Sequence, residues 1–147
     1  MGPEAKNLGY DKYMNEVINH FVFRTYKGRS ALIDPVTIEF LYKSFNDIAS
    51  TKGFKIVACK IMEDHVHCLI QFDHKHRPDY VIRMIKGISS REFFKSFKTN
   101  RLEYRKLWGR SYYAEEIGEE KVETIIDYIL NGQLDNSGHD KRYRISK

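Results

Sequence analysis

The chain has 147 residues, of which 41% are hydrophobic and 14% aromatic, and this is typical of one folded domain rather than a disordered chain. The 25 Lys and Arg against 20 Asp and Glu give a net charge of +5, which is compatible with nucleic-acid binding without establishing it. No segment approaches about 18 consecutive apolar residues, so we expect a cytoplasmic protein with no membrane contact. Cys59 and Cys68 lie in apolar segments without the spacing of a zinc or redox pair, and we expect buried, reduced thiols.

The first half of the chain predicts strand, helix, strand, strand. Residues 1–12 are polar and interpreted as a loose N-terminal arm, and residues 17–25 are rich in strand-forming residues. Asp34-Pro35 has the pattern of a helix N-cap followed by proline at the first helical position, and that helix should end near Gly53. Residues 54–62 and 65–72 then predict an antiparallel hairpin.

The second half predicts helix, strand, helix. Helical periodicity from Val81 to Phe97 is interrupted by Gly87–Ser90, which suggests a break or a cap, and residues 110–117 form an aromatic strand candidate. A last apolar stripe ends at Gly132, and residues 134–147 form a polar, basic tail. This order predicts one α+β domain over residues 1–147. Its plan is a ferredoxin-like or RRM-like antiparallel sheet with helices on one face, an open second face and an added C-terminal helix.

The tripeptide His65-Val66-His67 is the most informative motif. Because side chains alternate along a strand, the two imidazoles project together from the face opposite Val66, and a pair so placed can bind a divalent ion. The alternative is a pair of exposed or hydrogen-bonded histidines with no ligand. The remaining histidines show no comparable geometry and are expected at the surface without a role: His20, His74, His76 and His139.

Tyr128 lies off the apolar stripe of the last predicted helix, which is formed by Val122, Ile125, Ile126 and Ile129. It is therefore not expected in the core beneath that helix, although it could pack on another subunit. A phenol has a pKa of about 10 and is a weak nucleophile at neutral pH unless a metal ion polarises the phosphate that it attacks. With ten tyrosines in the chain, this position alone does not identify a nucleophile.

The segment from residue 83 to residue 110 carries nine Lys and Arg against two Glu, with aromatic residues interleaved. Basic side chains contact phosphates and aromatic rings stack on unpaired bases, so this segment is a candidate DNA-binding region. A solvated helix face with a few core aromatics explains the pattern equally well. The candidate DNA-binding residues are Arg83, Lys86, Arg91 and Arg110.

Four segments in order resemble the HUH-superfamily single-tyrosine transposases of the smallest insertion sequences and their REP-associated relatives: residues 63–70, 85–90, 107–113 and 128–133. The resemblance implies that His65 and His67 bind Mg²⁺ or Mn²⁺ and that Tyr128 is the nucleophile. It also implies a homodimer that binds DNA hairpins, cuts single-stranded DNA through a 5′-phosphotyrosine and acts at the nucleoid of a prokaryote. In such dimers the tyrosine helix of one subunit often serves the histidines of the other, and the sequence leaves open whether each active site forms within one chain or between two. Two imidazole ligands suit Mn²⁺ better than Mg²⁺.

The chain departs from the family pattern at the third metal ligand, commonly Gln or Asn four residues after the tyrosine. That position is Gly132, which has no ligand atom. A left-handed Gly132 could end the helix and direct Gln133 inward, so Gln133 is the preferred third ligand and Asn131 the other candidate.

Two other functions are compatible with parts of the sequence. An open four-stranded sheet with aromatic residues suits a non-catalytic single-stranded nucleic-acid-binding domain, although the aromatic signature of such domains is not evident. A rolling-circle initiator or relaxase-type nuclease shares the paired histidines, but the chain shows no helicase-sized second region and its Tyr128 segment fits the transposases better.

Overall fold

The computed structural model describes residues 5–7, 15–97 and 106–132. The strands are β1 (Ala5–Asn7), β2 (Glu16–Thr25), β3 (Lys55–Ile61), β4 (His65–Asp73) and β5 (Trp108–Glu116). The helices are α1 (Pro35–Lys52), α2 (Pro78–Ser96) and α3 (Val122–Asn131), with short 3₁₀ turns η1 (Tyr26–Gly28) and η3 (Glu119–Lys121). All strand pairs are antiparallel, in the order β1-β3-β4-β2-β5.

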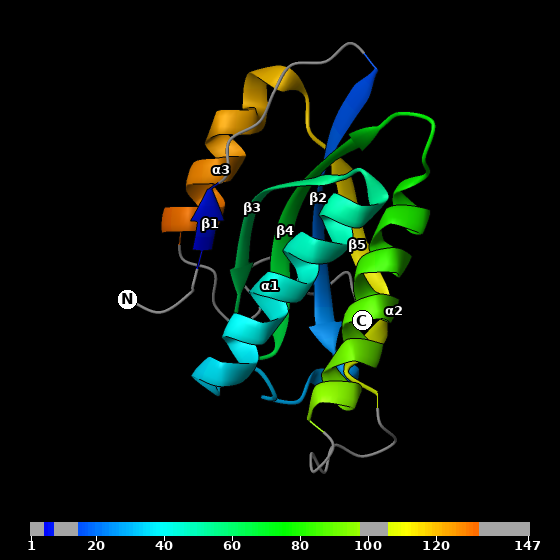
Figure 1. The fold of residues 1–147 in the computed structure, drawn as a ribbon. Coiled ribbons are helices and arrows are strands. Elements are labelled where there is room, and N and C mark those ends of the chain that lie inside the picture. The colour runs from blue at the N-terminus through cyan, green and yellow to red at the C-terminus, as the bar shows by residue number, and fades with distance from the viewer. Residues whose placement is uncertain (1–4, 8–14, 98–105, 133–147) are drawn as a thin grey trace.

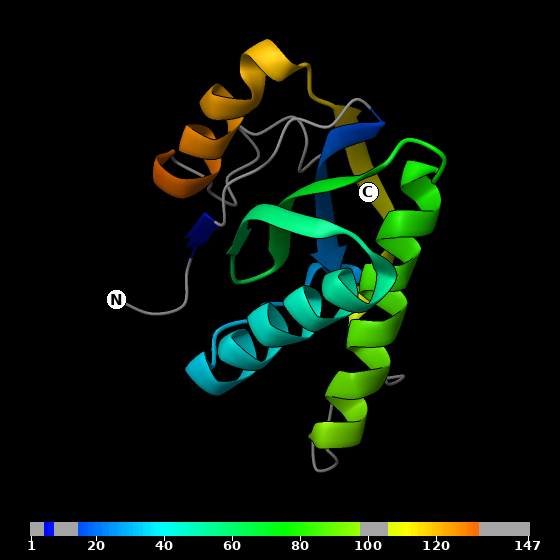
Figure 2. The ribbon, with the colours of Figure 1, turned by 45° about the horizontal axis from the view of Figure 1, so that its top comes forward.

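The sheet has helices on both faces. The succession β2-α1-β3-β4-α2-β5 confirms the ferredoxin-like α+β plan, with α1 and α2 packed on one face (Figure 1). Helix α3 lies on the other side of the sheet from α1, against β3 and β4 (Figure 2). The expectation of an open second face is therefore wrong, because the apolar stripe of α3 is buried against that face.

The ends of α1 follow the sequence pattern. The side chain of Asp34 accepts a hydrogen bond from the backbone N–H of Val36 at 2.9 Å, and Pro35 occupies the first turn. At the other end Gly53 adopts φ 83°, a left-handed conformation that glycine accepts without strain. The predicted boundaries of this helix are confirmed.

Helix α2 is continuous, so the predicted interruption at Gly87–Ser90 is wrong. The buried Ser89 hydroxyl donates to the Lys86 carbonyl at 3.2 Å and accepts from Trp108 Nε1 at 2.9 Å. The Ser89 hydroxyl and the Trp108 indole N–H thus have hydrogen-bond partners while the helix continues. Gly87 is exposed, and a Cβ added there would meet no atom within 4 Å. Tertiary contacts thus override the weak helix propensity of this segment.

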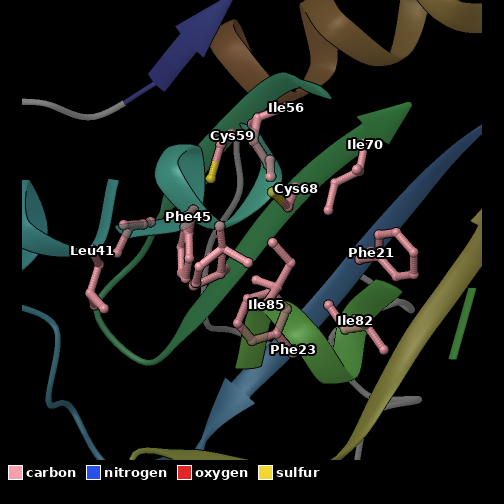
Figure 3. Packing of buried hydrophobic residues seen from close by; sticks show 14 of the residues in the cluster. Phe21, Phe23, Leu41, Phe45, Ile56, Cys59, Cys68, Ile70, Ile82 and Ile85 are labelled. Carbon is pink, nitrogen blue, oxygen red and sulfur yellow. The ribbon is translucent and has the colours of Figure 1, made fainter. Parts of the chain in front are cut away.

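The main core lies between the sheet and the helices α1 and α2. Phe21 and Phe23 of β2 pack there with side chains from β4, α1 and α2 (Figure 3). Cys59 and Cys68 stand opposite each other on β3 and β4 as free, buried thiols, and burial raises the pKa of Cys59. The expected burial of these thiols is confirmed.

The N-terminal arm differs in part from the prediction, because its residues 5–7 form β1 and pair with β3. The predicted tail, residues 134–147, lies outside the described residues. Within the described ranges, no helix combines the length and the apolar character needed to cross a membrane.

Candidate active site

His65 and His67 lie on the sheet face that α3 covers. Their neighbours on β4, Val66 and Cys68, belong to the core on the opposite face, so the predicted alternation is confirmed. Both histidines are fully buried, however, rather than surface side chains. The cause is a second apolar cluster that seats α3 on this face and consists of Ile18, Val57, Ala58, Leu69, Ile117, Val122, Ile126 and Ile129.

Protein contacts fix one ring nitrogen of each histidine. The Nδ1 of His65 donates to the carboxylate of Asp64 at 2.8 Å, and the Nδ1 of His67 lies 3.1 Å from Nε2 of His20. The two ring centroids are 5.1 Å apart. Because Nδ1 is engaged in both rings, Nε2 is the atom that each could offer to a metal. Both Nε2 atoms are buried and make no hydrogen bond to described residues.

His20 belongs to this site, contrary to the expectation of a surface histidine. It is fully buried in the centre of β2, and its ring centroid lies 5.3 Å from that of His67. The sequence already placed His20 on this face, because alternation along the strand puts it on the same side as Ile18. Detecting its contact with His67 required the register of β2 against β4, in which Val22 pairs with His67. The expectation holds for His74, which is exposed, while His76 is half-buried and His139 lies outside the described residues.

Tyr128 faces the histidines of its own chain. Its ring centroid is 6.1 Å from that of His67 and 6.4 Å from that of His20, with interplanar angles of 80° and 72°. Ile126 and Ile129, on the same helix, are buried against the sheet and hold α3 in this position. Tyr128 is half-buried, and its off-stripe position turns its ring toward the imidazoles.

Comparisons with known proteins identify the family of this chain. The family model described as "Transposase IS200 like" matches residues 13–132. The chain belongs to the IS200-like transposase family. A crystal structure of a Deinococcus radiodurans protein assigned as a transposase is 27% identical, with a TM-score of 0.65, over 84% of this chain and 95% of that one.

A REP-associated tyrosine transposase bound to a REP hairpin shares the fold, at 18% identity and a TM-score of 0.60. The match covers 82% of this chain and 68% of that one. No curated protein gives a significant match.

The histidine pair of this IS200-like transposase is compatible with a divalent metal, because imidazole nitrogens are common ligands of divalent ions. Among the described residues, no group of three or more His, Cys, Asp or Glu is placed to hold a metal. The alternative third ligand, Asn131, is exposed and donates through its amide to Asp127 at 2.9 Å. Gln133, the preferred one, lies outside the described residues.

Gly132 does not adopt the left-handed conformation that was expected. It ends α3 with φ −78° and ψ 170°, and its N–H donates to the Tyr128 carbonyl at 2.9 Å. Glycine is required there for a different reason. A Cβ at this position would clash with that carbonyl oxygen and lie 3.1 Å from Cδ1 of Tyr128. The end of the helix therefore packs directly on the proposed nucleophile.

We expect Gly132→Ala to destabilise this transposase by about 1–3 kcal/mol, because the end of α3 must shift to relieve the clash. Urea unfolding measures the change. Gly87→Ala is the matched control: no atom lies within 4 Å of its added Cβ, and alanine in a helix interior should stabilise by roughly 0.5–1 kcal/mol. Equal effects of the two substitutions would contradict this account of Gly132.

The four candidate DNA-binding residues do not line the histidine site. Arg83, Lys86 and Arg91 lie on α2, across the sheet from the histidines, and Arg83 pairs with Asp79 at 3.2 Å. Lys86 and Arg110 come together, since Lys86 Nζ donates to the Arg110 carbonyl at 3.2 Å. Burial lowers the pKa of Lys86 to about 8. Arg83, Arg91 and Arg110 are exposed.

Proposed function

We propose that this IS200-like transposase cleaves and rejoins single-stranded DNA through a 5′-phosphotyrosine on Tyr128. His65 and His67 would hold the divalent metal, Mg²⁺ or Mn²⁺. The observation that carries the proposal is the approach of the Tyr128 ring to the His67 ring within one chain, at 6.1 Å between centroids. A phosphate bound at the edge of this pair of rings would lie near both the phenol and a metal on the imidazole nitrogens.

The reaction conserves phosphodiester bonds. The Tyr128 oxygen, having lost its proton, attacks the scissile phosphorus, and the bond from phosphorus to the 3′ oxygen breaks. The departing 3′ oxygen takes up a proton and becomes a free 3′-hydroxyl, while the 5′-phosphate stays on Tyr128. A 3′-hydroxyl from another DNA end then attacks this phosphotyrosine, loses its proton and releases the phenol. No external energy source is needed.

The bound metal would act as a Lewis acid that withdraws electron density from the phosphate oxygens and so makes a phenol sufficient as nucleophile. The chain's own residues fix where it binds. Asp64 and His20 hold the two rings so that both Nε2 atoms are offered from the same face. Helix α3, which bears Tyr128, packs on that face.

We further propose that the DNA partners are hairpin ends of an insertion sequence and that the protein acts as a homodimer. The relative that was solved with a REP hairpin supports the first part. The second part follows from the reaction, since exchange between two DNA ends needs two nucleophiles. Each subunit would contribute one Tyr128 and one histidine pair.

The test is incubation of the protein with single-stranded element-end DNA and Mn²⁺ or Mg²⁺, followed by a denaturing gel. We expect a covalent protein–DNA adduct that EDTA prevents, and peptide mass spectrometry should locate the nucleotide on Tyr128. Tight DNA binding without an adduct would favour a non-catalytic binding domain. An adduct on another tyrosine would overturn the assignment of the nucleophile.

A further inference from the structure

A basic pocket adjoins the histidine site at the end of β2. Arg24 pairs with His65 in the register of β2 against β4, and it shares a sheet face with His20. The chain then enters η1, beside the first residues of β5, where Thr25 pairs with Trp108 (Figure 1). Arg24 thus connects the pocket to the strand that bears His65.

The pocket has the size and charge for part of a nucleic acid. Its volume is about 340 Å³, and three of its lining residues are cations: Arg24, Lys27 and Arg110. The rest of the lining is uncharged, consisting of Thr25, Tyr26, Gly28, Gly109 and Ser111. Pockets that hold small ligands begin at about 300 Å³, so one nucleotide unit can be accommodated.

Three cationic side chains lie around the aromatic ring of Tyr26. Nζ of Lys27 lies 5.5 Å from the ring centroid, and Nζ of Lys106 and Cζ of Arg29 each lie 5.4 Å from it. The Arg29 guanidinium is held in place, because its Nε donates to the Tyr26 carbonyl at 2.9 Å. A ring surrounded by cations is the combination that binds unpaired bases and the phosphates that join them.

The turn is shaped to bring Arg24 into the pocket. Lys27 and Gly28 both have positive φ, 59° and 68°, so the backbone reverses tightly over the end of β2. A Cβ at Gly28 would lie 2.7 Å from Nη2 of Arg24, which shows how closely the guanidinium packs under the turn.

We propose that this pocket, formed by η1 and the start of β5, binds a nucleotide of the single-stranded DNA substrate beside the active site. Its base stacks on Tyr26, and its phosphate lies near Arg24, Lys27 and Arg110. This inference rests on the proposed function for the identity of the substrate. It adds Arg24, Tyr26 and Lys27 to Arg110, which the sequence already gave as a candidate DNA-binding residue.

The test is fluorescence anisotropy with a labelled dT12 strand in EDTA, so that binding is read without cleavage. We expect Tyr26→Ala to weaken binding by about 5- to 100-fold through loss of stacking, and Tyr26→Phe to bind like the wild type. Lys27→Gln combined with Arg110→Gln should reduce the slope of log Kd against log salt by about 1.4, as two lost phosphate contacts predict. The control removes the same charge from exposed α1 and α2 positions with Lys52→Gln and Lys95→Gln, and it should leave the slope unchanged.

Equal slopes for the two double variants would overturn the phosphate contacts in the pocket. If Tyr26→Ala bound dT12 like the wild type, the proposal that a base stacks on Tyr26 would be refuted. The adduct assay separates this proposal from the previous one. An adduct on Tyr128 with unaltered dT12 binding by the pocket variants would refute the pocket alone, and altered binding without any adduct would refute the phosphotyrosine alone.

Discussion

A mixture of the Tyr128→Phe and His67→Ala variants is expected to form no covalent DNA adduct. Tyr128 faces the histidines of its own chain, with its ring 6.1 Å from that of His67. In a dimer of the two variants, one subunit therefore lacks the nucleophile and the other lacks a metal ligand, and neither site is complete. The adduct should fall to the background of each single variant, which is a complete loss.

The experiment needs a population of mixed dimers. Co-expression of the two variants with different affinity tags and sequential purification on both tags supplies it. The control is wild type paired with Tyr128→Phe, which should form about half of the wild-type adduct per dimer. An adduct on the His67→Ala subunit of the mixed dimer would show that α3 of one subunit serves the histidines of the other, and the arrangement within one chain would be refuted.

The fold was predictable because its signals are local. Asp34-Pro35 and Gly53 mark both ends of α1, and strict alternation around His65 and His67 separates two faces of β4. The predicted interruption of α2 was wrong for a non-local reason. Nothing near Gly87–Ser90 in the sequence shows that Trp108 donates to Ser89 and that the helix continues.

The candidate site was predictable only as far as one strand and one helix. The pairing of His65 with His67 depends on residue alternation, and Tyr128 on a helical stripe. The contact between His20 and His67 depends on the register of β2 against β4, which no local pattern fixes. The burial of both ligand candidates depends on where α3 packs, and the sequence gives only its apolar stripe.

His20→Leu is expected to weaken Mn²⁺ binding by about 10- to 100-fold, as loss of a group that orients a metal-ligating histidine typically does. For His67 to bind a metal through Nε2, its proton must be on Nδ1, and a buried N–H needs an acceptor. Nε2 of His20, at 3.1 Å, is the atom placed to accept when His67 has this tautomer. Leucine offers no acceptor, so the Nδ1 proton that metal binding through Nε2 requires would be buried without an acceptor, and this lowers the affinity for the ion. Isothermal titration of the DNA-free protein with Mn²⁺ measures the loss.

His20→Gln is the matched variant, because a glutamine carbonyl can accept from the same Nδ1, and it should keep most of the Mn²⁺ affinity. Thermal unfolding of both variants in EDTA separates a metal-specific effect from a packing defect in the centre of β2. If the two variants lost affinity equally while unfolding like the wild type, the ring of His20 would matter for its shape and not for its hydrogen bond. Unchanged affinity in His20→Leu would remove His20 from the site altogether, and the orientation of His67 would then depend on the sheet alone.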